Sequence, residues 1–200
     1  MKATRKKLAA LLLGGLLSLS LLTACGSQPA EPSAPSEPQS SAPSSSSEVQ
    51  SLGQFSTTDI YGKTVTQDIF SQYDLTMVNL FATWCSPCVQ EIPELAQLRK
   101  NMESQGVNVI GVVMDAASPE GTSEETLAQA KVLAERTGAD YPLLIPDQTA
   151  FNGRLIGVTT IPETFFVDRE GNIVGETYLG ARDLNAWTDI VTKELEGVQS

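Results

Sequence analysis

The run Trp84-Cys85-Ser86-Pro87-Cys88 holds two of the three cysteines of this 200-residue chain. Two cysteines separated by two residues can join in a small disulfide and open again to two thiols. Each such cycle accepts or donates two electrons, and the group that attacks is a thiolate. The spacing therefore indicates thiol–disulfide exchange.

Two other readings of the cysteine pair need different surroundings. Half of a zinc site needs two more Cys or His ligands. The chain has no histidine, and its third cysteine, Cys25, belongs to a different kind of segment. A purely structural disulfide between neighbours closes too short a loop to stabilise the fold much. The redox reading is favoured, and no metal or bound cofactor is expected beyond the cysteine pair.

The cysteine run lies between a strand pattern and a helix pattern. Leu75 to Phe81 is a nearly continuous apolar stretch, typical of a buried strand. A helix is expected to begin at the cysteines and to run to about Gln105, with a kink at Pro93. A helix N-terminus favours a thiolate, because its unpaired N–H groups and its dipole face the sulfur.

The other elements expected in the domain follow from apolar patterns and turn residues. They are an N-terminal hairpin (Phe55–Ile60 with Lys63–Val65), a helical turn (Thr66–Tyr73), a buried strand (Val107–Met114), a helix ending before Gly138 (Thr122–Thr137), a second hairpin (Phe165–Val167 with Ile173–Tyr178) and a last helix capped by Asp183. This order predicts an α/β fold with a mixed central sheet flanked by helices.

The first 51 residues predict export and tethering. Residues 1–24 carry a basic start and a short, broken apolar run, typical of a signal peptide. The run ends in Leu22-Thr23-Ala24-Cys25, which resembles a bacterial lipobox, so Cys25 is the expected lipidated residue. An uncleaved anchor or an ordinary secretory signal is the alternative, and each also exports the domain. Residues 25–51 are rich in Ser and Pro and are expected to form a disordered tether before a domain at 52–200.

The charge excludes one class of partner. The full chain has a formal net charge of −11, and the four basic residues of the signal would be lost on cleavage. An acidic surface repels phosphate backbones, so nucleic acid is not an expected partner.

The order of elements around the cysteine run resembles the thioredoxin fold. The stretch Gly157 to Asp168, which contains Ile161-Pro162-Glu163-Thr164, resembles the cis-proline segment of exported, membrane-tethered thioredoxins of the TlpA/ResA kind. Its Pro-Glu-Thr-Phe part is especially similar to reductases of cytochrome c maturation. The resemblance covers residues 52–197 and includes the N-terminal hairpin and the helical insert near 122–137.

The resemblance implies roles for four residues. Cys85 matches the nucleophilic cysteine and is expected to be the more exposed thiol, while Cys88 matches the resolving cysteine. Pro162 matches the cis-proline next to the dithiol, against the alternative of a trans proline at a strand start. Ile161 is expected to offer backbone groups to an extended substrate segment.

Glu91 is a candidate proton acceptor. It lies three residues after Cys88 and so on the same side of the helix. General thioredoxins place a buried Asp six residues before the first cysteine, where this chain has Asn79, which does not titrate. TlpA/ResA-like proteins share this exchange. The alternative is an ordinary carboxylate facing solvent.

Trp84 and Pro87 are expected to support substrate binding at the dithiol. Trp84 is interpreted as a contact residue over the thiols, against the alternative of a large apolar packing residue.

The leading functional hypothesis is a lipid-anchored disulfide reductase on the outer face of the bacterial cytoplasmic membrane. The resemblance implies a membrane thiol carrier of the CcdA/DsbD kind as electron donor and exported disulfide proteins as substrates, either apocytochrome c or a methionine sulfoxide reductase. Three alternatives stay open: a disulfide-forming oxidase, a thiol peroxidase and a non-catalytic binding lipoprotein. The peroxidase pattern Pro-x-x-x-Thr-x-x-Cys is absent, with Val78 at the proline position.

Overall fold

The computed structural model describes residues 50–118 and 121–200. Their central element is a five-stranded mixed sheet of order β7-β4-β3-β8-β9. Strands β3 (Leu75–Phe81), β4 (Val107–Val113) and β7 (Leu143–Leu144) run parallel, and β8 (Glu163–Asp168) and β9 (Ile173–Leu179) are antiparallel to their neighbours. The predicted mixed sheet is confirmed.

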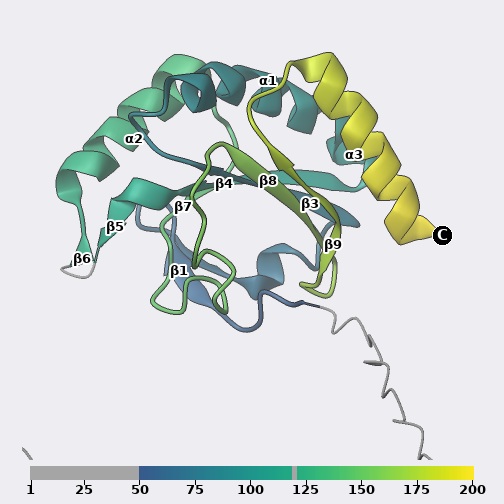
Figure 1. The fold of residues 1–200 in the computed structure, drawn as a ribbon, viewed down its shortest axis with the longest axis horizontal. Helices are drawn as coiled ribbons and strands as arrows, with labels where there is room; N and C mark the ends of the chain where they lie inside the picture. Colours follow the sequence, from purple (N-terminus) through teal and green to yellow (C-terminus); the bar gives the residue numbers. More distant parts are fainter. Residues whose placement is uncertain (1–49, 119–120) are drawn as a thin grey trace, which may run out of the picture. The chain divides into compact units, whose positions relative to one another are not determined.

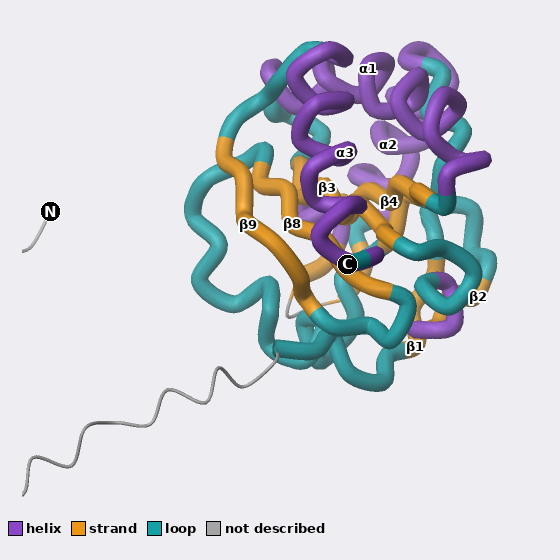
Figure 2. Tube along the Cα trace, turned by 90° about the vertical axis from the view of Figure 1, so that its right-hand side faces the viewer, coloured by secondary structure: helices purple, strands orange, loops and turns teal. Residues whose placement is uncertain are grey.

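The three helices lie together on one face of the sheet (Figures 1 and 2). They are α1 (Ser86–Met102), α2 (Glu124–Thr137) and α3 (Leu184–Gln199), and one hydrophobic core joins them to that face. A second core covers the opposite face. There the N-terminal hairpin of β1 (Ser56–Thr58) and β2 (Thr64–Thr66) and the turns at 150–158 replace helices as the cover.

The central strands form where their sequences are mostly apolar. Every residue of β3 and of β4 is buried, which explains why neither shows the alternation of a half-exposed strand. The predicted bounds of β3 coincide with the observed ones. Because β3 leads directly into the cysteine run, its burial fixes the point at which the chain reaches the site.

Short elements depart from the sequence-based expectation. Helix α1 ends at Met102 and is followed by a 3₁₀ turn, η2 (Glu103–Gln105). It continues without a break through Pro93. Helix α2 begins at Glu124, because the Ser123 hydroxyl accepts a hydrogen bond from the Thr126 N–H and caps it. Elements too short for a periodic signal were missed or only partly anticipated, namely η1 (Gln67–Ile69), η3 (Met114–Ala116), β5 (Ala117–Ser118), β6 (Gly121–Thr122) and β7.

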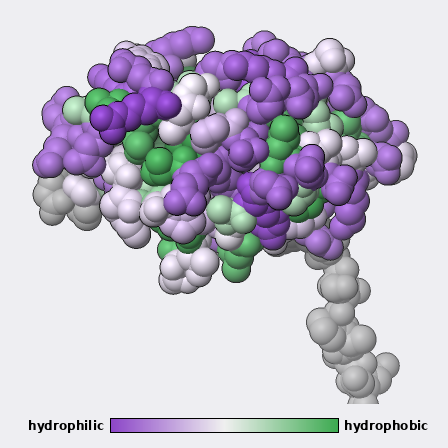
Figure 3. Space-filling view, turned by 90° about the horizontal axis from the view of Figure 1, so that it is seen from above, coloured by the Kyte–Doolittle hydropathy of each residue, from purple (hydrophilic) through white to green (hydrophobic). Residues whose placement is uncertain are grey.

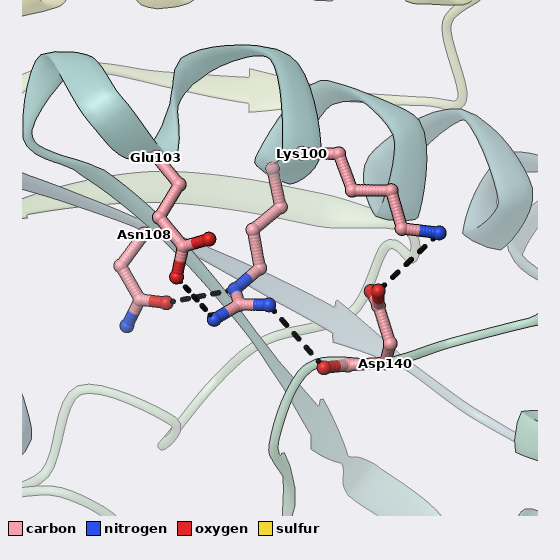
Figure 4. A network of polar contacts seen from close by, with 5 residues as sticks. Lys100, Glu103, Asn108 and Asp140 are labelled. Atoms are coloured by element: carbon pink, nitrogen blue, oxygen red, sulfur yellow. Dashed lines mark hydrogen bonds and ion pairs between the residues drawn. The ribbon is translucent and has the colours of Figure 1, made fainter.

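A polar network fastens the C-terminal end of α1 to the sheet (Figure 4). The Arg99 guanidinium donates to Asn108 Oδ1 on β4 (3.4 Å), to the Asp140 carbonyl (3.4 Å) and to the Glu103 carboxylate (2.8 Å). Lys100 Nζ lies 3.3 Å from Asp140 Oδ2. Exposed ion pairs stabilise little by themselves. The network joins the end of α1 that is remote from the cysteines to β4 and to the loop at Asp140.

Helix α3 starts at the predicted cap. The Asp183 carboxylate accepts a hydrogen bond from the Ala186 N–H at 2.9 Å. Replacing Asp183 by Ala is expected to lower the free energy of unfolding by about 1 kcal/mol, because one helix N–H loses its partner. Urea unfolding measures the change. Asp189→Ala in the middle of the same helix is the control and should be neutral or slightly stabilising, since Ala is the better helix former. Equal losses in both variants would contradict the cap.

The surface over the helices is mostly hydrophilic, with separate hydrophobic groups (Figure 3). No helix within the described ranges 50–118 and 121–200 has the length and apolar character to cross a membrane. The predicted signal peptide, the predicted lipidation site Cys25 and most of the predicted tether lie outside the described residues.

Candidate active site

The two cysteines form a disulfide at the N-terminus of α1. Cys85 and Cys88 are joined, with their Cα atoms 5.3 Å apart. Cys85 is the N-cap residue, and its sulfur accepts a hydrogen bond from the Cys88 N–H at 3.4 Å. Pro87 occupies the first turn, where its missing N–H costs no hydrogen bond. The geometry places the Cys85 sulfur where helix N–H groups stabilise a thiolate after the disulfide opens.

The two cysteine residues are both buried and differ slightly in exposure, in the expected direction. Cys85 is 5% exposed and Cys88 is 1% exposed in this oxidised form. Neighbouring Trp84 is 74% exposed, so the alternative of a packing residue for this side chain is wrong. Its contact with a substrate stays a prediction.

A carboxylate from the end of β4 holds the turn before the cysteines. Asp115 accepts hydrogen bonds from the Thr83 N–H (3.1 and 3.2 Å) and from the Thr83 hydroxyl (2.6 Å). The Cys85 N–H donates to the Ala82 carbonyl within the same turn. These bonds fix the path of the chain from β3 into α1.

The proline segment lies beside the end of β3. The Ile161–Pro162 peptide bond is cis, as the resemblance implies. The β3–β8 register pairs Leu80 with Glu163, which brings residue 162 next to the strand end that leads to Cys85. Pro162 is buried and Ile161 is half-buried. Their part in substrate binding stays a prediction.

Glu91 lies in a buried polar network behind the disulfide. It is 2% exposed, so the alternative of a carboxylate facing solvent is wrong. Its Oε1 accepts from the Trp187 indole N–H (2.7 Å) and from the Arg182 main-chain N–H (2.8 Å), and its Oε2 accepts from Asn79 Nδ2 (3.1 Å). Asn79 Nδ2 also donates to Thr164 Oγ1 (3.0 Å). One carboxylate therefore joins α1 to β3, α3 and the loop before α3.

Burial and polar contacts act on the ionisation of Glu91 in opposite directions. Burial raises the pKa of the Glu91 carboxyl above its ordinary value. The hydrogen bonds from Arg182, Trp187 and Asn79, together with the positive charge of Arg182, lower the pKa and oppose the effect of burial. A carboxylate with a raised pKa, one helical turn after Cys88, has the properties of a proton acceptor for that thiol.

An ion pair holds the start of β8. Arg154 Nη2 lies 2.6 Å from Glu163 Oε1, and both side chains are nearly buried. The Arg154 guanidinium also lies 4.1 Å from the centre of the Phe165 ring. The pair ties the turns at 150–158 to the residue that follows Pro162.

Sequence reasoning found the dithiol, Glu91 and Pro162 but missed their supports. Trp187 lies on the predicted last helix, but nothing in the sequence indicated that its indole N–H bonds Glu91. Arg182 and Asp115 carried no recognisable sequence signal. Thr164 lies in the Pro-Glu-Thr motif, which was the one clue to its position. The described parts of the chain hold no cluster of three or more His, Cys, Asp and Glu side chains suited to a metal ion.

Comparison with known proteins places this site in a family. The family described as AhpC/TSA matches residues 50–175, which include both cysteines, Glu91 and Pro162. The chain belongs to the AhpC/TSA family. The thioredoxin fold expected from the sequence is confirmed by a solved structure, the thiol:disulfide interchange protein of the thioredoxin family from Chlorobium tepidum TLS. It is 29% identical with a TM-score of 0.59, over 73% of this chain and 96% of that one.

Curated relatives of this AhpC/TSA chain are named as thiol–disulfide exchange proteins, and one of them carries the name ResA that the resemblance implied. The thiol:disulfide interchange protein DsbE of Haemophilus influenzae is 31% identical over 126 residues, 63% of this chain and 62% of that protein. The thiol-disulfide oxidoreductase ResA of Geobacillus thermodenitrificans is 30% identical over 96 residues, 48% of this chain and 49% of that protein. The matches thus span less than two thirds of these relatives' lengths. The predicted resemblance to ResA-like thiol–disulfide oxidoreductases is confirmed.

Proposed function

We propose that this protein is a membrane-tethered, extracytoplasmic thiol–disulfide oxidoreductase that reduces disulfides in exported proteins. The observation that carries the proposal is the Cys85–Cys88 disulfide at the N-terminus of α1, with the buried Glu91 carboxylate one turn further along. The cysteine pair is itself the electron carrier.

The reaction divides between the two cysteines. In the reduced protein the Cys85 thiolate attacks a target disulfide, forms a mixed disulfide and releases one target sulfur as a thiolate. Cys88 then gives its proton to Glu91 and attacks the Cys85 sulfur. The bond between Cys85 and the target breaks, the second target sulfur leaves as a thiolate, and the Cys85–Cys88 disulfide forms. Two electrons have passed from the dithiol to the target.

Each part of the site has a place in this cycle. The N-cap position of Cys85 stabilises its thiolate as nucleophile and as leaving group. Exposed Trp84 and half-buried Ile161 lie on the segments that flank the dithiol and are proposed to contact the substrate. Pro87 shapes the cysteine run at the start of α1, and Pro162 shapes the segment that leads into β8.

The proposed setting follows from the N-terminal sequence. Cleavage before Cys25 and lipidation of its thiol would anchor the domain to the outer face of the cytoplasmic membrane, with residues 25–51 as tether. A membrane thiol carrier of the CcdA/DsbD kind would supply electrons from inside. Candidate substrates are apocytochrome c and an exported methionine sulfoxide reductase. The names of the DsbE and ResA relatives support disulfide exchange over peroxidase activity.

Thiol trapping in intact cells tests the direction of electron flow. Because a reductase outside the cytoplasm must be re-reduced continually, Cys85 and Cys88 are expected to be mostly reduced at rest. Removing the membrane thiol carrier should shift them to the disulfide. Alkylation with a maleimide of known mass, followed by a gel shift, measures both states. A pair that is oxidised at rest and indifferent to the carrier would establish the oxidase alternative.

A further inference from the structure

Arg182 contacts the proton acceptor and also holds the loop that surrounds it. It lies between β9 and α3, one residue before the α3 cap. Its main-chain N–H donates to Glu91 Oε1 at 2.8 Å. Its side chain turns back, and Nη1 donates to the carbonyls of Leu179 (3.2 Å) and Gly180 (2.7 Å). The guanidinium therefore closes the loop in the shape that aims the Arg182 N–H at Glu91.

The same guanidinium covers the aromatic side chains behind Glu91. Its central carbon lies 5.1 Å from the centre of the Trp187 ring and 5.4 Å from the centre of the Tyr178 ring. Trp187 in turn donates its indole N–H to Glu91 Oε1. Stacking of a guanidinium on an aromatic face is an attractive contact that an uncharged side chain does not make. Arg182 thus holds in place both groups that donate to Glu91 Oε1, its own main-chain N–H and the Trp187 indole N–H.

The charges around Glu91 are few. Asn79 on β3, Thr164 on β8 and Trp187 on α3 bring neutral groups to the network. From α1 itself come Cys88 and, one turn further, Glu94, whose carboxylate accepts from the Leu184 N–H.

Tyr141, from the loop before β7, is a buried phenol within electrostatic range of Glu91. Its pKa is raised by burial, so it is neutral. Among residues 50–118 and 121–200, Arg182 is the cation whose charge favours ionised Glu91.

We propose that Arg182 is a positioning residue that keeps Glu91 ionised and correctly bonded, so that Glu91 can take the proton of Cys88. The proposal rests on the proposed function and adds to it a residue that touches neither substrate nor sulfur. In the step concerned, the proton moves from Cys88 Sγ to a Glu91 carboxylate oxygen, the Cys88–Cys85 bond forms, and the bond from Cys85 to the target sulfur breaks.

The direction in which loss of the Arg182 charge shifts the pKa of Glu91 follows from the burial of this carboxyl. Without the guanidinium, burial acts on Glu91 with less opposition, so the carboxyl holds its own proton to a higher pH. A protonated carboxyl cannot accept the Cys88 proton. Release of the target should therefore slow on the acidic side and recover on the alkaline side, where Glu91 is ionised even without Arg182.

The experiment compares Arg182→Met, Arg182→Lys and a control in the full-length protein. Met keeps much of the apolar stem and removes the charge, while Lys keeps the charge and loses the planar fork. Arg169→Met is the control, because Arg169 follows β8 at the end of the sheet away from Glu91 and pairs with Asp74. Thermal unfolding checks that each variant is folded.

Two readouts are measured. The first is the titration of the Glu91 carboxyl carbon by NMR in the disulfide form, in which Cys88 carries no proton. We expect a higher midpoint in Arg182→Met than in wild type, an intermediate one in Arg182→Lys, and no change in Arg169→Met.

The second readout is single-turnover reduction of a disulfide-bonded model peptide by the reduced protein. We expect Arg182→Met to lose rate at pH values below the measured wild-type midpoint of Glu91, by up to about tenfold for each unit by which the midpoint rises. The loss should largely disappear at about pH 9.

The outcomes separate this inference from the proposed function. An unchanged Glu91 midpoint in Arg182→Met, or a rate loss equal at every pH, overturns the role of Arg182 even if wild type reduces the peptide. If wild type fails to reduce the peptide, the proposed function fails, and the NMR midpoint still decides whether Arg182 controls the ionisation of Glu91.

Discussion

Replacing Cys88 by Ser is expected to trap partner proteins on Cys85 as mixed disulfides. Exchange passes through a mixed disulfide, and Cys88 is the sulfur that normally resolves it. Intramolecular groups act at effective concentrations on the order of 10⁵ M, whereas an external thiol is present at millimolar concentration. The turnover rate of a protein disulfide should therefore fall by at least about a thousandfold. The burial of Cys88 beneath Cys85 keeps external thiols from its place.

The trapped species are detected on non-reducing gels of cells that express the full chain. Bands of higher mass should appear with Cys88→Ser and vanish with dithiothreitol. They should be absent from the double variant Cys85→Ser, Cys88→Ser, which is the matched control for expression and anchoring. Adducts that persist in the double variant would have formed on Cys25, and would show that this cysteine is not lipidated. Turnover that is unchanged in Cys88→Ser would rule out the two-cysteine mechanism.

Replacing Glu91 by Gln is expected to slow disulfide reduction by about a hundredfold near neutral pH, a typical contribution of general acid–base catalysis. Gln keeps the size of the side chain and cannot accept the Cys88 proton. The deficit should shrink as the pH rises, because Cys88 then ionises without help. The pH dependence of single-turnover reduction measures the effect. Glu135→Gln, at an exposed position of α2, is the control and should follow the wild-type profile.

The amide introduced by Glu91→Gln can be accommodated without loss of hydrogen bonds. Its oxygen can accept from Trp187 and Arg182 as Glu91 Oε1 does. Its nitrogen would face Asn79 Nδ2, which is also a donor. Rotation of the Asn79 amide by half a turn brings Oδ1 to this position, and the Thr164 hydroxyl then donates to Oδ1 where it formerly accepted. A rate loss in this variant therefore reports the missing proton acceptor.

The same substitution should raise stability above the pH at which free Glu ionises. The raised pKa means that folded Glu91 holds its proton more tightly than unfolded Glu91. The stability contributed by this proton is complete at low pH and is lost as the pH rises through the folded pKa. The amide of Glu91→Gln does not titrate, so the variant avoids this loss. Its free energy of unfolding should exceed that of wild type by about 1.4 kcal/mol for each unit by which the pKa is raised. Urea unfolding of the oxidised protein measures it, and a difference between wild type and Glu91→Gln that does not grow with pH would contradict the raised pKa.

Elements with strong local signals were predictable from the sequence. The nearly continuous apolar run of β3 defined both ends of that strand, since a strand buried on both faces is apolar at most of its positions. Asp183 and Gly138 marked a helix start and a helix stop, because a side-chain cap and a left-handed residue act on their own neighbours. The spacing of the two cysteines indicated disulfide exchange for a similarly local reason, because it places both sulfurs on one helical turn.

The surroundings of Glu91 were decided only by the tertiary structure. A helix carboxylate three residues after a cysteine is equally consistent with a buried acid and with a solvent-facing one. The donors that allow burial are the indole of Trp187 and the main-chain N–H of Arg182, which lie 96 and 91 residues away in the sequence. A buried carboxylate is tolerated only where such donors converge, and their convergence depends on the packing of α3 against α1. The sequence alone therefore indicated the cysteine pair and the helix that begins at it, while the packing of distant segments decided that Glu91 is buried and hydrogen-bonded.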